Sequence, residues 1–128
     1  MNIAQYTKAA SLEEAWELNQ KRSAVVLGGC CWLRLSPQRR IAQAIDLSAL
    51  GLDQIEEGED SFRLGAMVTL GQLEGHDGLA AFTQGAMKEA VRHIVGTQFR
   101  NMATVGGSIT GRFGFSDIWT LFLALDAQ

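Results

Sequence analysis

The chain has 128 residues, of which 47% are hydrophobic and 20% are charged, and its formal net charge is −3 at pH 7. This length is enough to bury a substantial core, and the composition excludes an intrinsically disordered chain. A slightly acidic balance without a basic stripe excludes nucleic acid as the expected partner.

The first third of the chain predicts a β–α–β unit. Two apolar stretches, Ile3 to Tyr6 and Ala24 to Leu27, are typical of a short strand and of a fully buried strand. Between them, Ser11 and Glu14 have the spacing of a helix N-cap and its capping box, and the helix is expected to end near Gln20. Strand, helix and strand at this spacing favour parallel strands joined by a right-handed crossover.

The predicted helix places Leu12, Ala15 and Trp16 on one face, and we expect that face to be buried. A third short strand is predicted over residues 44–47. These elements together predict a first subdomain over residues 1–51.

A paired glycine, Gly28-Gly29, follows the second predicted strand directly. Ligands of open α/β sheets bind at the carboxyl ends of the strands, so this loop is a candidate site for a phosphate. The adjacent Cys30 and Cys31 match no zinc or iron–sulfur spacing, and we interpret them as small buried apolar residues and Trp32 as a core residue. Without a disulfide framework or a signal peptide, the expected location is the cytoplasm.

The second part of the chain, residues 52–128, predicts a hairpin followed by helices. Strands are expected over residues 52–55 and 61–66, joined by an acidic turn that faces water. One long helix is predicted from Asp77, as its N-cap, to Val95, and Gly96 ends it. A last helix, capped by Ser116 or Asp117, is apolar on all sides and is therefore expected to be buried. The two histidines, His76 and His93, have no partners at ligand spacing, and no role is expected for them.

A second paired glycine lies within Thr104-Val105-Gly106-Gly107-Ser108. Successive backbone N–H groups in such a turn can form a nest for an anion, most often a phosphate. Two Gly-Gly loops in one small protein suggest two clamps on one diphosphate.

The flanks of this loop resemble those of a known family. Thr-x-Gly-Gly-Ser is followed by Asp117 and by an apolar run that ends Ala-Leu-Asp-Ala, and residues 98–101 read Gln-Phe-Arg-Asn. This pattern resembles the flavin-binding subunit or domain of the molybdenum hydroxylases, the group of xanthine dehydrogenase, aldehyde oxidase and carbon monoxide dehydrogenase. Residues 45–47 and 64–70 are similar to that family's Ile-Asp-Leu and Ile-Gly-Ala-x-Val-Thr-Leu.

The resemblance implies an α+β, PCMH-type FAD-binding fold, with a small parallel βαβ subdomain and an incomplete second subdomain of antiparallel sheet and helices. It also implies FAD as the cofactor, and Ile94 as an apolar residue against the flavin ring. The implied FAD-binding residues lie in the two glycine loops, at the end of the long helix and at the start of the last one: Leu27, Gly28, Gly29, Cys30, Cys31, Ile94, Thr104, Val105, Gly106, Gly107, Ser108 and Asp117.

The function implied by the resemblance is an electron-transfer subunit that passes electrons from iron–sulfur partners to NAD or another acceptor. A molybdopterin-binding large subunit and a [2Fe-2S] subunit are the expected partners, and the isolated chain is expected to lack dehydrogenase turnover. Because the family's subunit continues beyond this point, we expect a homodimer for the isolated chain.

Three residues in the two glycine loops depart from the family pattern. Cys30-Cys31 stands where the family has Thr-Asp, and Ser108 stands where it has Asn. A thiol is a weaker donor to phosphate than a hydroxyl. The alternative function is therefore a non-catalytic assembly or binding module of the same fold that has lost FAD. A third possibility is another enzyme with a phosphate-containing ligand, but the sequence has no Gly-x-Gly-x-x-Gly or Walker pattern that would support it.

Overall fold

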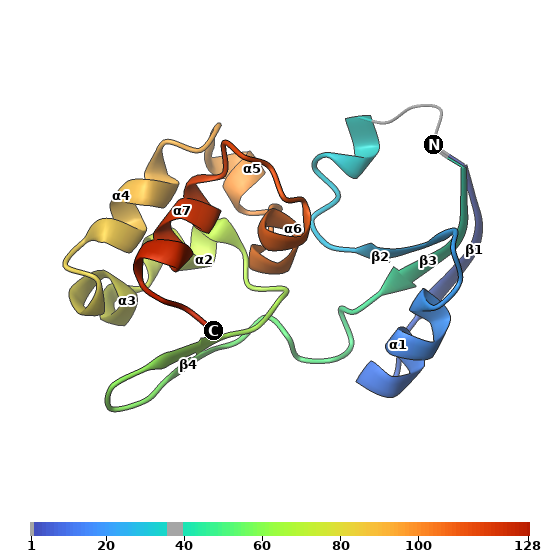
Figure 1. The fold of residues 1–128 in the computed structure, drawn as a ribbon, viewed down its shortest axis with the longest axis horizontal. Coiled ribbons are helices and arrows are strands. Elements are labelled where there is room, and N and C mark those ends of the chain that lie inside the picture. Colours follow the sequence, from blue (N-terminus) through green and yellow to red (C-terminus); the bar gives the residue numbers. More distant parts are fainter. Residues whose placement is uncertain (1, 36–39) are drawn as a thin grey trace.

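The protein folds into a small sheet with one covering helix and a larger helical part beside it (Figure 1). The computed structural model describes residues 2–35 and 40–128. The elements are β1 (Asn2–Lys8), α1 (Leu12–Asn19), β2 (Ala24–Leu27), the 3-10 helix η1 (Leu33–Leu35), β3 (Arg40–Asp46), β4 (Ile55–Glu57), β5 (Phe62–Leu64), α2 (Leu70–Gly75), α3 (Asp77–Phe82), α4 (Ala86–Arg92), α5 (Thr97–Arg100), α6 (Val105–Thr110) and α7 (Asp117–Ala124).

The N-terminal sheet is parallel throughout, as the sequence predicts, but its strand order is β1-β3-β2. The third strand therefore lies between the two strands of the expected β–α–β unit, and it is longer than predicted. Ile41, Ala44 and Ile45 of β3 are fully buried, which suits a central strand. By contrast β2 is a sheet edge, and Val26 is 39% exposed, so the expectation of a fully buried strand is wrong.

Helix α1 begins as predicted. The Ser11 hydroxyl accepts a hydrogen bond from the Glu14 N–H at 3.1 Å, and the Glu14 carboxylate accepts one from the Ala10 N–H at 2.7 Å. Its expected buried face is wrong in part, because only Ala15 is buried whereas Trp16 is 65% exposed. The core beneath α1 consists of Ala9, Ala15 and Ile45, with Leu18 of the helix packed against it, whereas Leu12 and Trp16 remain exposed.

The second part contains the predicted antiparallel hairpin and the main core. Strands β4 and β5 pair antiparallel, and β5 is shorter than the sequence pattern indicates. The prediction for the first strand is wrong in position, because β4 shares only Ile55 with residues 52–55 and includes Glu56 and Glu57 of the expected turn. Helices α2 to α7 pack around a cluster of buried apolar side chains from several elements, and the burial of these side chains stabilises this part. The members of the cluster are Val68, Leu70, Leu73, Leu79, Met87, Val91, Ala103, Val105 and Ile118.

The single long helix predicted from Asp77 is two helices, α3 and α4. The chain reverses at Gln84 and Gly85, whose φ values are 51° and 85°, so the helix cannot continue. The Thr83 hydroxyl donates to the Leu79 carbonyl at 2.7 Å and accepts from the Met87 N–H at 3.1 Å, which joins the two helices. The expected N-cap is also one residue late, since the ring of His76 accepts from the Leu79 N–H.

The last helix, α7, is capped by Ser116 and not by Asp117, because the Ser116 hydroxyl accepts from the Trp119 N–H at 3.3 Å. Ile118 is buried, but Leu123 is 69% exposed. Ile118 is the one buried residue of α7, so the expectation of a helix buried on all sides is wrong. In residues 2–35 and 40–128, no helix has both the length and the apolar character needed to cross a bilayer.

Val95 lies at the end of the α4 segment in a strained conformation. Its φ is 52°, which is unfavourable for a β-branched residue, and its side chain is 79% exposed and adds little packing. We predict that Val95→Gly raises the free energy of unfolding by about 0.5–1 kcal/mol, measured by urea denaturation.

The matched control is Gly85→Ala at φ 85°, where an added Cβ meets no atom within 4 Å. This change should lower stability by about 1 kcal/mol through backbone strain alone. A neutral or destabilising Val95→Gly would contradict the assignment of strain to Val95.

Candidate functional site

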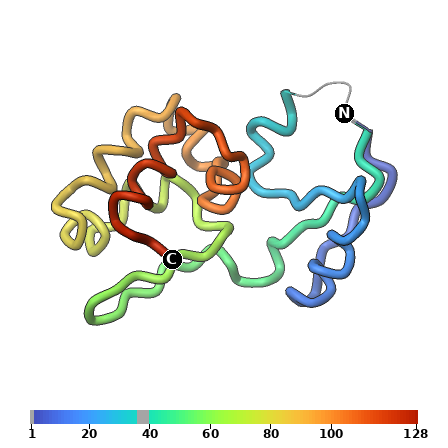
Figure 2. Tube along the Cα trace, viewed as in Figure 1, coloured from blue at the N-terminus to red at the C-terminus, as the bar shows by residue number. Residues whose placement is uncertain are grey.

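The two glycine pairs meet where the N-terminal sheet and the helical part come together. A Cβ built on Gly29 would lie 1.7 Å from the Met102 carbonyl oxygen, so only glycine fits there. A Cβ on Gly28 would lie 2.8 Å from the Thr104 hydroxyl oxygen and 3.9 Å from the Gly107 Cα. Figure 2 shows the chain after β2 passing directly beside the segment that leads into α6. The structure thus brings together two loops that the sequence separates by more than seventy residues.

The first loop carries backbone donors that the protein itself does not use. In the part of the chain that the structure describes, the N–H groups of Gly29, Cys30 and Cys31 donate no hydrogen bond. Cys30 has a φ of 57°, and a left-handed residue within a turn is one feature of anion-binding nests. The unused donors and this left-handed residue are compatible with the predicted phosphate site.

The second loop differs from the prediction of a nest. It forms the N-terminus of α6, and its N–H groups are already hydrogen-bonded within the protein. The Val105 N–H donates to the Val68 carbonyl, the Gly106 N–H to the Ala66 carbonyl, and the Gly107 N–H to the Thr104 hydroxyl. The Ser108 N–H donates to the Thr104 carbonyl, as in an ordinary first turn. The second loop therefore lacks the unused backbone donors that the first loop has, and the expectation of two clamps on one diphosphate stays a prediction.

Within the second pair, the two glycines have different tasks. A Cβ on Gly106 would lie 2.7 Å from the Ala66 carbonyl oxygen, so this glycine allows the chain to pack closely against the segment before α2. Gly107 is exposed, and a Cβ there would meet only the Thr104 hydroxyl oxygen at 3.0 Å. Gly107 therefore leaves open space at the surface where the two loops meet.

A cleft of about 710 Å³ opens between the two parts of the molecule at this contact. That volume is within the range of ligand sites in proteins. Nine of the twelve residues predicted for the site line it, whereas Leu27, Val105 and Gly106 do not. The nine are Gly28, Gly29, Cys30, Cys31, Ile94, Thr104, Gly107, Ser108 and Asp117.

Several cleft residues were missed or misassigned from the sequence. Trp32, which we expected in the core, is 49% exposed and lines the cleft, as do Phe113 and Phe115. Val95 also lines it, next to Ile94. The signal that could have indicated the phenylalanines is their place immediately before the Ser116 cap, in the segment that leads from the glycine loop to α7.

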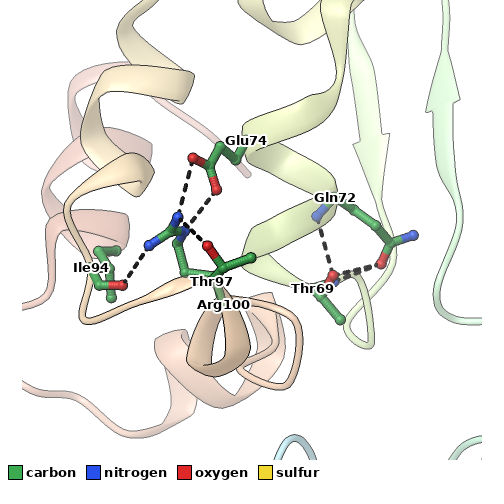
Figure 3. A network of polar contacts seen from close by, with 6 residues as sticks. All are labelled: Thr69, Gln72, Glu74, Ile94, Thr97 and Arg100. Carbon is green, nitrogen blue, oxygen red and sulfur yellow. Dashed lines mark hydrogen bonds and ion pairs between the residues drawn. The ribbon is translucent and has the colours of Figure 1, made fainter.

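A buried ion pair holds the chain around Ile94. The Arg100 Nε lies 2.7 Å from Glu74 Oε2, and the Arg100 guanidinium also donates to the Ile94 carbonyl at 3.2 Å (Figure 3). A third bond reaches the Thr97 hydroxyl at 3.4 Å. The side chain of Arg100 is 9% exposed, so this one residue ties α2, the end of α4 and α5 together. Ile94 is thereby fixed at the wall of the cleft.

The two cysteines of the cleft differ in pKa from redox-active thiols. Burial raises the pKa of both Cys30 and Cys31, which keeps them protonated near neutral pH. The Cys30 thiol lies 3.3 Å from the Gly28 carbonyl oxygen, and Cys31 packs against the main core. These contacts agree with small packing residues, although both are only half-buried. No group of three or more potential metal ligands occurs among the described residues.

The sequence profile of one family, described as the FAD binding domain in molybdopterin dehydrogenase, matches residues 2–128. The chain belongs to this family. FAD is the cofactor that this membership supports, and the free N–H groups of the first loop and the open face of Gly107 fit its anionic diphosphate.

Curated relatives agree with the family. The chain is 33% identical over 129 residues to the protein YgfM of Escherichia coli, covering 98% of this chain and 48% of that one. It is 36% identical over 110 residues to the nicotine 6-hydroxylase medium subunit of Paenarthrobacter nicotinovorans, covering 81% of this chain and 38% of that one. The chain therefore spans half or less of the length of these relatives.

Solved structures confirm the fold. A cyanide-inactivated Cu,Mo-CO dehydrogenase matches 97% of this chain and 45% of its own, with a TM-score of 0.86 and 25% identity. A carbon monoxide dehydrogenase from Hydrogenophaga pseudoflava, which lacks the Mo-pyranopterin moiety, matches 82% of this chain and 38% of its own, with a TM-score of 0.74 and 27% identity. The predicted α+β class, with a parallel and an antiparallel sheet, is thus confirmed.

The Arg100 network generates a stability prediction. Arg100→Met leaves the Glu74 carboxylate without its partner in a partly buried place, and we expect a loss of about 3 kcal/mol of unfolding free energy. The measurement is chemical denaturation of both proteins.

Arg92→Met is the matched control, because Arg92 forms an exposed ion pair with Glu89 at 3.1 Å. This variant should lose at most about 0.5 kcal/mol of unfolding free energy. Adding Glu74→Leu to Arg100→Met should restore part of the loss, since no unpaired charge then remains. Equal behaviour of the Arg100 and Arg92 variants would contradict the role given to the network.

Proposed function

We propose that this chain is the FAD-binding part of the medium subunit of a molybdenum-containing dehydrogenase or hydroxylase. In this role electrons pass from iron–sulfur partners to NAD or another acceptor. The observation that supports the proposal is the cleft where the Gly28-Gly29 loop, with its unused N–H groups, meets Thr104 and Gly107. When bound, FAD supplies the redox chemistry, and the chain holds and orients it.

The geometry suggests a division of tasks inside the cleft. The N–H groups of Gly29 to Cys31 donate to the diphosphate, and Gly107 leaves room for it. Ile94, held in place by Arg100, provides an apolar wall for the flavin ring. Asp117 does not cap α7 and is exposed at the cleft, so its carboxylate is free to accept hydrogen bonds from a ligand. Residues 1–51 and 52–128 act as the two halves of the site.

The partners in this proposal are a molybdopterin-binding large subunit and a [2Fe-2S] subunit, in line with the nicotine 6-hydroxylase medium subunit that the chain resembles. In this proposal the molybdenum and iron–sulfur centres belong to the partner subunits, so we expect no dehydrogenase turnover from the isolated chain. A cytoplasmic location suits its two free cysteines.

Two observations favour a second candidate, an assembly module of the same fold without FAD. The Cys30 thiol, which stands where the family has threonine, donates to the Gly28 carbonyl oxygen within the protein. The N–H groups of the second loop are also occupied within the protein. In this candidate the cleft would serve contact between subunits only.

The test is the visible absorption spectrum of the purified chain after FAD is added and excess is removed. We expect a bound-flavin spectrum for the natural chain and its loss in Gly107→Val, because the new side chain fills the space beside Thr104. The fold should survive, since the only atom near the added Cβ is a side-chain oxygen. Gly75→Val is the control, because Gly75 is exposed on α2 with no atom within 4 Å of an added Cβ.

A natural chain that stays colourless with FAD would favour the assembly module. Unchanged FAD affinity in a folded Gly107→Val variant would instead remove the second loop from the site. Circular dichroism of each variant separates loss of binding from loss of fold.

We also infer that the isolated chain forms a homodimer. Leu123 and Leu125 at the C-terminal end are 69% and 41% exposed, and within the described residues β5 pairs only with β4. Light scattering at high concentration should give twice the mass of one chain for the natural protein, and the mass of a monomer for Leu123→Glu. A stable monomer of the natural chain would contradict the inference.

A further inference from the structure

Three aromatic side chains form a cluster on the wall of the cleft. The ring centroids of Trp32 and Phe113 are 5.1 Å apart, those of Phe113 and Phe115 are 5.4 Å apart, and those of Trp32 and Phe115 are 6.2 Å apart. These are the separations of rings in contact. We call Trp32, Phe113 and Phe115 the aromatic wall.

The aromatic wall joins segments from the two parts of the molecule. Trp32 directly follows the loop that carries the unused N–H groups, whereas Phe113 and Phe115 lie between α6 and α7. All three line the cleft, next to Asp117. The wall therefore lies within a few residues of both the anion nest and a free carboxylate.

Internal packing does not explain the exposure of this cluster. Phe115 is 71% exposed and Trp32 is 49% exposed, so much of their apolar surface faces water inside a concave site. Exposed aromatic surface in a cleft is typical of a binding site for a flat ring. The neighbouring N–H groups match the phosphates attached to such a ring in a dinucleotide.

We propose that the aromatic wall stacks against one of the planar rings of the bound dinucleotide, adenine or isoalloxazine, and selects for it. This inference rests on the proposed FAD site and adds the residues that recognise a ring. The two rings share the same stacking chemistry, so separate probes must distinguish them. ADP carries only adenine with the diphosphate, and FMN carries only isoalloxazine with one phosphate.

The experiment measures the dissociation constants of FAD, ADP and FMN for the full chain by titration calorimetry. Phe115→Ala is the main variant, because its side chain is so exposed that its removal should leave the fold intact. Loss of a stacked ring should lower the affinity for FAD by roughly tenfold. If the stacked ring is adenine, the affinity for ADP should fall by the same factor and the affinity for FMN should not change. If the ring is isoalloxazine, the affinity for FMN should fall and the affinity for ADP should not change.

Two further variants make the result specific. Phe115→Tyr keeps the ring and should keep the affinity. Phe82→Ala removes an aromatic residue that is 53% exposed, contacts Phe62 and lies outside the cleft lining, so it should change no affinity. Trp32→Ala should repeat the fragment preference of Phe115→Ala, which would support one shared stacking surface.

Three outcomes overturn the inference. If the natural chain binds FAD but Phe115→Ala and Trp32→Ala bind it equally well, the wall does not contact a ring, although the FAD site stands. If the variants weaken ADP and FMN equally and also lower the melting temperature, the wall only holds the two parts together. If the natural chain binds none of the three probes, both the inference and the FAD site fail.

Discussion

The contact of the Gly29 backbone with the Met102–Ala103 segment is the constraint on which the site depends. A Cβ at Gly29 would collide with the Met102 carbonyl, so the sheet and the helical part can approach this closely only with glycine at that position. The approach places Gly28 against Thr104, and the cleft opens beside this contact. A larger residue at position 29 would separate the walls that a ligand has to touch at the same time.

The glycines of the two pairs are not equivalent. Gly29 and Gly106 are required by close backbone packing, whereas Gly28 and Gly107 meet at the Thr104 hydroxyl, and Gly107 leaves its surface open. The hydrogen-bond donors are also divided unequally, because the second loop uses its N–H groups to begin α6 and to join residues 66–68. In the proposed site, anion recognition therefore falls to the first loop, whose Gly29, Cys30 and Cys31 N–H groups have no partner among the described residues. This asymmetry would reduce the importance of the Cys30 thiol, since backbone groups would make the contact.

Two side-chain groups then shape the cleft from the helical part. Arg100 binds Glu74 and the Ile94 carbonyl from an almost fully buried position, which fixes the wall at the end of α4. In the aromatic wall, Phe113 and Phe115 lie on the segment before α7 and contact Trp32, which follows the first glycine loop. The first group makes the site rigid through buried hydrogen bonds, and the second leaves apolar surface open for a ligand.

The sequence by itself determined the local and the family-level features. The Ser11 cap and the parallel and antiparallel character of the two sheets follow from patterns of a few neighbouring residues, and the family motif selects twelve residues of which nine line one cleft. Only the tertiary structure decided the position of β3 at the centre of the sheet, the break at Gln84 and Gly85, and the exposure of Trp16 and Trp32. These depend on which surfaces meet across long separations in the chain. The apolar periodicity of the sequence continues across residues 83–85, although the Thr83 hydroxyl and a left-handed turn break the helix there. An aromatic residue suits a buried core and a cleft wall equally well, so only the opposing surface decides between them.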